Sequence, residues 1–337
     1  MSTFMKILTV ATSALLVGVS LVVAPVGAPL TASAETIVSQ LGNDIDGEGI
    51  GDNSGYSVSL SGDGTRVAIG SPFNGDAGSQ AGQVRLYDWD GTAWTQVGAD
   101  INGEAADDLF GWSVSLSSDG SRVAIGATGN TGFQLGTDAG QVELYDYNGT
   151  AWVQVGSDID DEAVGDHSGY SVSLSGDGTR VAIGSPFNGD AGSQAGQVRL
   201  YDWDGTAWIQ LGVDIEGEAA GDASGYSVSL SSDGTTVAIG AKYNDQSATD
   251  AGHVRLYRWD GTAWIQLGAD IDGEATTNAF FGWSVSLSSD GETVAIGAPS
   301  NGSGQVELYH YNGTAWVQLG SDINGDAVVD HFGLSVS

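Results

Sequence analysis

The sequence predicts an all-β protein, a β-propeller built from four-stranded antiparallel blades. Three observations lead to this prediction: a repeat of 52 to 58 residues, two tight-turn signals in each repeat, and apolar–polar alternation without helical periodicity. The repeat is marked by a Thr-Ala-Trp triplet that ends at Trp94, Trp152, Trp208, Trp264 and Trp316. Residues 54–94 are identical to residues 168–208. A period of this length indicates that each unit buries its apolar faces against its neighbours.

One repeat contains four short stretches with the alternation of β-strands. In the second repeat they are Phe110–Ser117, Arg122–Gly126, Gln141–Tyr147 and Thr150–Gly156. Asp119-Gly120 joins the first two stretches and Asn148-Gly149 joins the last two, and both pairs predict two-residue type I′ hairpin turns. The unit is therefore expected to be a four-stranded antiparallel meander.

The two inner strands carry small residues on one face. Ser57 and Ser59 alternate with Val58 in the first strand, and Ala68 and Gly70 alternate with larger apolar residues in the second. Small residues allow a neighbouring sheet to approach, so both faces of each sheet are expected to be buried, as in propeller blades. A β-solenoid is the competing architecture, but its coils are usually shorter and lack paired hairpin turns.

The ends of the chain depart from the repeat. Residues 35–54 contain Thr36–Gly42, which resembles the fourth strand of a repeat and predicts a strand that closes the ring. Complete blades are expected at 55–110, 111–168, 169–224, 225–281 and 282–332, followed by the beginning of a further unit at 333–337. The sequence thus predicts five complete blades with partial units at both ends, and a parent ring of six or seven blades.

The first 34 residues have the layout of a secretory signal peptide. Lys6 precedes an apolar run from Ile7 to Ala24, and Ala32-Ser33-Ala34 is a small-residue cleavage site. An uncleaved membrane anchor is the alternative, because the run approaches the roughly 20 residues of a spanning helix. The cleavage site favours removal before Glu35, so we expect a secreted or cell-surface protein without membrane insertion after processing.

Acidic residues dominate the charge of the chain. The formal net charge is −34, and cysteine is absent, so no disulfide can stabilise the exported protein. A surface of this charge repels nucleic acids and anionic lipids, which excludes both as expected partners. The excess of acid over lysine is typical of a saline habitat, and turn chemistry of the many Asp residues explains it equally well.

The start of each repeat carries a motif that resembles the FG-GAP repeat of integrin-α-like β-propellers. Phe110-Gly-Trp-Ser-Val-Ser-Leu followed by Val123-Ala-Ile-Gly-Ala shows the resemblance, as do Phe281-Gly282 and Phe332-Gly333. It spans the chain after residue 35 and implies a propeller that acts in extracellular binding or adhesion. Members of that family hold calcium between the first two strands of a blade. Here that loop is reduced to Ser-x-Asp-Gly, which cannot supply the six to eight oxygen ligands of calcium, so the site is not carried over.

A second acidic element lies between the fourth strand and the next blade. Three acidic residues recur within nine positions, as Asp44, Glu48, Asp52; Asp100, Glu104, Asp108; Asp158, Glu162, Asp166; and Asp214, Glu218, Asp222. The series continues as Asp270, Glu274 and Asn278, then as Asp322, Asp326 and Asp330. Calcium is the candidate cofactor of these acid loops, because carboxylates and backbone carbonyls are its preferred ligands. The alternative is that these residues cap turns of the interblade connection.

Aromatic residues occur in the variable loops that join the second and third strands. Phe73, Phe133, Phe187 and Tyr243 are the candidate binding residues, since variable loops on a rigid scaffold usually form recognition surfaces. The alternative is that they fold inward against the loops. The tryptophans of the third and fourth strands recur so regularly that packing at the blade edge explains them best, and carbohydrate binding is the alternative.

Catalytic residues are not indicated. The chain has four histidines and no cysteine, and no serine or lysine stands beside a base at a recognisable spacing. We therefore expect a non-catalytic binding or adhesion module whose partner is an extracellular protein or carbohydrate. A structural, cation-binding surface repeat protein and a polysaccharide-active hydrolase or lyase are the alternatives.

Overall fold

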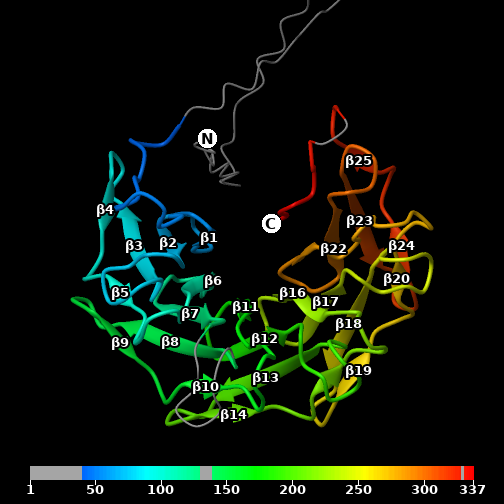
Figure 1. Cartoon of the computed structure of the whole chain (residues 1–337), viewed down its shortest axis with the longest axis horizontal. Coiled ribbons are helices and arrows are strands. Elements are labelled where there is room, and N and C mark those ends of the chain that lie inside the picture. The colour runs from blue at the N-terminus through cyan, green and yellow to red at the C-terminus, as the bar shows by residue number, and fades with distance from the viewer. Residues whose placement is uncertain (1–39, 130–138, 328–329) are drawn as a thin grey trace, which may run out of the picture.

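The computed structural model describes residues 40–129, 139–327 and 330–337. Its regular structure consists of β-strands in five antiparallel sheets, here called blades one to five, which confirms the all-β propeller architecture. The blades follow one another along an arc around a common centre, and blades one and five flank an opening (Figure 1). The predicted signal peptide lies outside the described residues, as does most of the predicted closing strand; residues 40–42 contain no strand. No described segment is a helix long and apolar enough to span a bilayer.

Each blade contains four main strands and a fifth strand of two residues. Blade one comprises β1 (Ser57–Leu60), β2 (Arg66–Ser71), β3 (Gln83–Trp89), β4 (Trp94–Gln96) and β5 (Ile101–Asn102). Blade two comprises β6 (Phe110–Leu116), β7 (Arg122–Ala127), β8 (Gln141–Tyr147), β9 (Trp152–Gln154) and β10 (Ile159–Asp160). Blade three comprises β11 (Ser171–Leu174), β12 (Arg180–Ser185), β13 (Gln197–Trp203), β14 (Trp208–Gln210) and β15 (Ile215–Glu216). Blade four comprises β16 (Ser224–Leu230), β17 (Thr236–Ala241), β18 (His253–Trp259), β19 (Trp264–Gln266) and β20 (Ile271–Asp272). Blade five comprises β21 (Ser284–Leu287), β22 (Thr293–Ala298), β23 (Gln305–Tyr311), β24 (Trp316–Gln318) and β25 (Ile323–Asn324).

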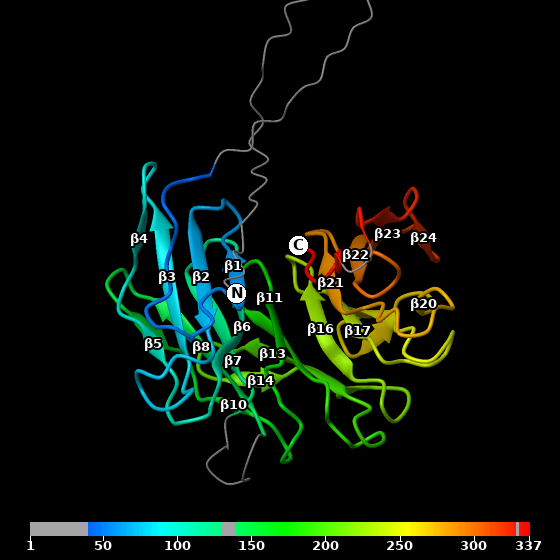
Figure 2. The same cartoon turned by 45° about the horizontal axis from the view of Figure 1, so that its top comes forward.

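The first strand of each blade faces the centre and the fourth lies at the periphery, as the tilted view also shows (Figure 2). The fourth strand is shorter than the sequence predicted: in blade two it ends at Gln154 instead of Gly156. Gly156 has a φ of 80°, which turns the chain before Ile159–Asp160 returns to the sheet. The outer edge is therefore split, because β9 pairs with the end of β8 and β10 pairs with its beginning.

The predicted type I′ turns are wrong. That turn needs a positive φ at both central residues, and here Gly64 has a φ of 70° whereas Asp63 has no positive φ. Five residues, 61–65, separate β1 from β2, and the Gly64 N–H donates to the Ser61 carbonyl. The Asp63 carboxylate accepts hydrogen bonds from the Thr65 N–H and the Ser61 hydroxyl, so the aspartate stabilises the turn through its side chain.

The repeated serines join neighbouring blades. The Ser113 hydroxyl donates to the Gly169 carbonyl at 2.7 Å, and the Leu174 N–H donates to the Ser115 hydroxyl at 2.9 Å. The same pair of hydrogen bonds recurs from blade to blade. The Ser-Val-Ser motif therefore supplies the small polar groups that hydrogen-bond across the interblade contact, while its valine remains free to pack in the core.

The hydrophobic core lies between successive sheets. Val84 and Leu86 of blade one pack with Val123 and Ile125 of blade two, and all four are at most 1% exposed. Equivalent clusters fill the later interfaces. The tryptophan of each fourth strand closes the outer end, as Trp152 shows by donating its indole N–H to the Val97 carbonyl of the preceding blade at 3.0 Å. The expected blade-edge role of these tryptophans is thus confirmed.

Candidate functional site

Five aromatic side chains form a continuous row along the inner strands of the propeller. We call this row the aromatic collar; it consists of Tyr56, Trp112, Tyr170, Tyr226 and Trp283. Each member comes from a different blade and immediately precedes the Ser-Val-Ser motif. Successive ring centroids lie 4.7, 5.5, 4.8 and 5.2 Å apart, and the rings are tilted against one another. Tyr56 is 47% exposed and the others are half-buried, so the collar retains surface for a ligand.

A glycine with positive φ places each collar residue. Gly111 has a φ of 87°, and a Cβ there would lie 2.8 Å from the Gln83 carbonyl oxygen of the preceding blade. The register between β6 and β7 also shifts between Phe110 and Ser113, and the Trp112 N–H donates to the Leu109 carbonyl. This bulge turns the chain out of the regular strand just before Trp112. The other four blades have the same glycine–aromatic pair, with a φ of 80–85° at the glycine.

The predicted binding aromatics of the loops pack against the collar. Phe73 contacts both Tyr56 and Trp112, with ring centroids 6.3 and 6.5 Å apart. Phe187 meets Tyr170 edge-on at 6.0 Å. Tyr243 meets Phe280 at 5.6 Å, and Phe280 in turn contacts Trp283 of the collar. All three loop residues are half-buried, so they extend the collar outward; Phe133 lies outside the described residues.

A lysine of the chain itself is held by the collar. Lys242 is 3% exposed, and its Nζ lies 3.5 Å from the ring centroid of Tyr226 and 3.8 Å from that of Trp283. Tyr243 is the third close ring, at 4.5 Å. Burial lowers the pKa of Lys242 to about 8, and Asp250 acts weakly in the opposite direction. The collar can therefore hold a cation between its rings.

The first and third acids of the predicted acid loops act in local structure. Asp100 accepts a hydrogen bond from Gln96 Nε2 at 2.6 Å. The first acid of every acid loop makes the same bond with a glutamine four residues earlier. Asp222 accepts from the Ala219 N–H and from Asn244 Nδ2, which ties the acid loop to the loop between the second and third strands. The backbone hydrogen bonds confirm the turn-capping interpretation for the third acid, whereas the first acid accepts its hydrogen bond from a glutamine side chain.

In blades one, three and four, the second acid of the acid loop lies near a buried arginine of the third strand. Arg85, Arg199 and Arg255 occupy equivalent positions there, at most 6% exposed. Their Nη1 atoms lie 3.5–3.8 Å from the acids Glu48, Glu162 and Glu218. Arg199 also pairs with buried Asp161 at 2.7 Å. In three blades, therefore, an internal arginine already compensates the acid loop.

Blades two and five have glutamate in place of this arginine. Glu143 is 1% exposed and accepts hydrogen bonds from Gln141 and from the Tyr145 hydroxyl. Burial raises the pKa of Glu143 to about 7, and the nearby carboxylates of Asp158 and Glu104 act in the same direction. The equivalent Glu307 also has a raised pKa because of burial. In these two blades, therefore, burial favours the protonated form of a glutamate on the third strand.

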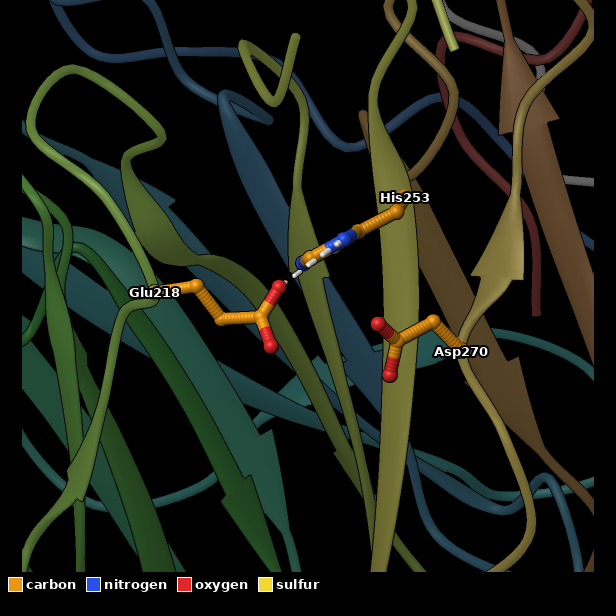
Figure 3. Close-up of side chains that lie close together, drawn as sticks. All are labelled: Glu218, His253 and Asp270. Atoms are coloured by element: carbon orange, nitrogen blue, oxygen red, sulfur yellow. Dashed lines mark ion pairs between the residues drawn. The ribbon is translucent and has the colours of Figure 1, made fainter. Parts of the chain in front are cut away.

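The structure does not gather the three acids of one loop into a single ligand set. Among residues 40–129, 139–327 and 330–337, the one group of three possible metal ligands is Glu218, His253 and Asp270. It takes Glu218 and Asp270 from two successive acid loops and adds a histidine from β18 (Figure 3). Calcium binding within single acid loops stays a prediction.

The collar is the feature that the sequence analysis missed. The signal was present, because the Ser-Val-Ser motif of each of the five blades follows tyrosine or tryptophan. Strand alternation alone places these aromatics on the same face as Val58 and Leu60, so the pattern did not separate them from ordinary strand residues. The glycine that precedes each aromatic was the better indicator, since a glycine inside a strand often marks a bulge.

The comparisons with known proteins agree with this architecture. Residues 159–201 match the family model described as FG-GAP repeat. No curated protein matches the sequence. Among solved structures, hydrazine synthase of Kuenenia stuttgartiensis is 14% identical, with a TM-score of 0.52, over 82% of this chain and 69% of that one. A candidate 6-phosphogluconolactonase from Bacteroides uniformis is 12% identical, with a TM-score of 0.57, over 82% and 73%. A protein of unknown function from Desulfotomaculum acetoxidans is 13% identical, with a TM-score of 0.54, over the same shares.

Likeness at such low identity shows the fold alone. The match to the family model falls on one repeat, from the end of blade two to the third strand of blade three. Much of that repeat, residues 168–201, is identical in sequence to residues 54–87 of blade one, and all five blades share its strand order. This chain therefore contains an FG-GAP repeat at residues 159–201 and folds as a β-propeller.

Proposed function

We propose that this chain is a secreted or cell-surface, non-catalytic binding module that holds cationic side chains of an extracellular protein on its aromatic collar. The observation that supports the proposal most strongly is the collar itself. Five blades contribute one aromatic ring each to a single partly exposed row. Packing alone does not require five aromatic rings to remain partly exposed in a row, whereas recognition of a partner does.

The position of Lys242 supports a cationic ligand. Its ammonium group lies over Tyr226 and Trp283 at distances typical of cation–π contacts. In blades one, three and five the equivalent residue is Pro72, Pro186 or Pro299, which leaves the rings there without an internal cation. A lysine or arginine side chain of a partner would find the same kind of rings between the other collar members.

The charge of the surrounding loops supports the same ligand class. Exposed acids on the loops next to the collar include Asp76, Asp107, Asp190 and Asp245. The described arginines are largely engaged inside the molecule: Arg66, Arg122 and Arg180 pair with aspartates, and three others are buried on the third strands. A negative field around exposed aromatic rings attracts positively charged side chains and speeds their association.

Binding of a short arginine-rich peptide tests the proposal by surface plasmon resonance. The matched peptide carries citrulline, which keeps the shape of arginine and removes its charge. We expect the Trp112→Ala variant to bind the arginine peptide about five- to tenfold more weakly, the range of one cation–π contact. Lys242→Ser should bind it more tightly, because the substitution frees two rings and removes a positive charge.

Ile209→Ser is the matched control, since Ile209 lies on the outer strand β14 and is 51% exposed. This variant should bind like the parent protein. Equal binding of the arginine and citrulline peptides would overturn the proposal. So would binding of a neutral oligosaccharide that Trp112→Ala abolishes while arginine peptides do not bind, because the collar would then be a sugar-stacking surface.

A further inference from the structure

Every blade contains the same arrangement of three positions near its outer half. It consists of the second acid of the acid loop before the blade, the first residue of the third strand, and the first acid of the acid loop that follows the blade. These positions hold Glu48, Gln83 and Asp100; Glu104, Gln141 and Asp158; Glu162, Gln197 and Asp214; Glu218, His253 and Asp270; and Glu274, Gln305 and Asp322. Blade four alone has histidine where the others have glutamine.

The histidine of blade four is buried without a hydrogen-bond partner. His253 is 1% exposed, and neither ring nitrogen has a hydrogen-bond partner among the described residues. Its Nδ1 lies 3.8 Å from Glu218 Oε2, which is too long for a hydrogen bond. The ring points toward the Glu218 carboxylate, and Asp270 lies beside it (Figure 3). A buried polar ring that is left unpaired costs about 1–3 kcal/mol, a cost that coordination of a metal ion or a hydrogen bond to an ordered water would offset.

We propose that Glu218, His253 and Asp270 bind a divalent transition metal of the zinc class. One ligand atom of each residue lies within 4.8 Å of the other two. An imidazole nitrogen with two carboxylate oxygens is a donor set that suits zinc, whereas calcium takes oxygen ligands only. Blade four thus has a metal preference that the glutamine-containing blades lack.

The arrangement needs only small movements to reach coordination geometry. Ligand atoms at about 2.0–2.1 Å from a tetrahedral zinc ion lie about 3.4 Å from one another. The Glu218 side chain is 40% exposed and therefore able to rotate toward the histidine, and water can supply the fourth ligand. Arg255 lies 3.5 Å from Glu218, but its Nη2 donates to the Glu216 carbonyl at 2.7 Å, so it keeps a partner when the carboxylate turns to the metal.

Calorimetric titration of the tag-free protein with zinc chloride tests this site. We expect one equivalent to bind and the thermal midpoint to rise in its presence, because a ligand of the folded state stabilises it. His253→Gln, which copies the sequence of the other four blades, should weaken zinc binding at least about tenfold. His310→Gln removes a histidine outside the arrangement and should leave the affinity unchanged.

A gain of binding provides the complementary test. Blade three matches blade four at Glu162, Arg199 and Asp214, and it carries Gln197 in place of the histidine. The Gln197→His variant should therefore bind a second equivalent of zinc. No zinc binding by the parent protein, or undiminished binding by His253→Gln, would overturn the proposal. A stoichiometry that stays at one in Gln197→His would show that these three positions do not create the site.

Discussion

At the scale of the residue, one glycine in each second strand sets the distance between blades. Gly184 has the extended backbone of its strand, and a Cβ added there would lie 2.1 Å from the Gly225 carbonyl oxygen and 2.4 Å from Ser171 Oγ. Neither contact can relax easily, since both belong to the hydrogen-bonded interface with blade four. The absence of a side chain, rather than conformational freedom, is what this position requires.

The Gly184→Ala variant should therefore be strongly destabilised. We expect a loss of about 2–3 kcal/mol in the free energy of unfolding, the usual cost of forcing an extra carbon into a packed interface. Gly189→Ala, five residues further on, is the control, because a Cβ there meets nothing within 4 Å. Urea unfolding of both variants measures the difference. A Gly184→Ala protein as stable as Gly189→Ala would contradict the described interblade distance.

The buried Glu143 makes stability depend on pH. Its folded pKa of about 7 lies above the ordinary value of 4.5, so the folded protein binds this proton more tightly than the unfolded chain does. The contribution of Glu143 to stability is fully present below about pH 4.5 and is lost as pH rises to about 7. Glu143→Gln should consequently raise stability at pH 8 by about 3 kcal/mol and leave it almost unchanged at pH 4.5.

Thermal melts of the parent and Glu143→Gln proteins across this range check the prediction. Glu292→Gln is the control, because this exposed glutamate lies in a turn of blade five. Its melting curve should follow the parent curve at every pH. A Glu143→Gln protein that is less stable than the parent at pH 8 would mean that the carboxylate is compensated by a group that the structure does not place beside it.

At the scale of the element, the acid loop and the loop between the second and third strands form one unit. Asp222 joins them by accepting hydrogen bonds from the Ala219 N–H at 3.2 Å and from Asn244 Nδ2 at 2.9 Å. A bridge between Gly252 and Phe281 ties the end of the same strand-joining loop to the start of blade five. The loops around the collar are thus held by hydrogen bonds in addition to the aromatic contacts of Phe73, Phe187 and Tyr243.

Loss of the Asp222 carboxylate should loosen this unit. Asp222→Ala leaves two donors without their acceptor and should cost about 1–3 kcal/mol of stability, whereas Asp222→Asn keeps one acceptor oxygen and should cost less. Thermal melts rank the two variants. Equal stability of the parent and Asp222→Ala proteins would show that water replaces the carboxylate and that the loop does not depend on it.

The sequence predicted the elements better than their connections. Alternation located the first three strands of each blade, because each is a run with small or apolar residues on defined faces. The turns were assigned wrongly, since Asp-Gly permits several geometries and the Asp63 side chain, not its backbone, decides between them. The split fourth strand was also missed, because the return of Ile159 to the sheet depends on a burial site between two blades.

The site was predicted only in part. Phe73, Phe187 and Tyr243 were identified from loop variability, and the structure places all three against the collar or against Phe280 beside it. The collar itself depends on five residues, each more than 50 positions from the next, coming together around one centre; the local glycine–aromatic pattern marks each residue but does not show that they meet. The group Glu218, His253 and Asp270 was missed for the same reason, since it combines two acid loops with a strand.

At the scale of the whole molecule, repetition turns a weak local feature into a surface. A single half-buried tyrosine would hold a partner poorly, whereas five rings at centroid distances of 4.7–5.5 Å offer several equivalent places for cationic side chains. The same repetition allows one blade to diverge without loss of the fold, as Lys242 and His253 show in blade four. Under the two proposals above, the propeller is a scaffold on which single blades acquire separate binding chemistry.

The central claim is that partners bind at the collar, and a hydrogen–deuterium exchange footprint tests it most directly. The arginine-rich peptide is added at saturating concentration, and the protection of backbone amides is compared with that of the free protein. We predict protection around the collar, at residues 53–57, 110–113, 168–171, 224–227 and 280–284. Protection confined to the turns between the first two strands, or to the outer fourth strands, would contradict the claim and place the binding surface elsewhere.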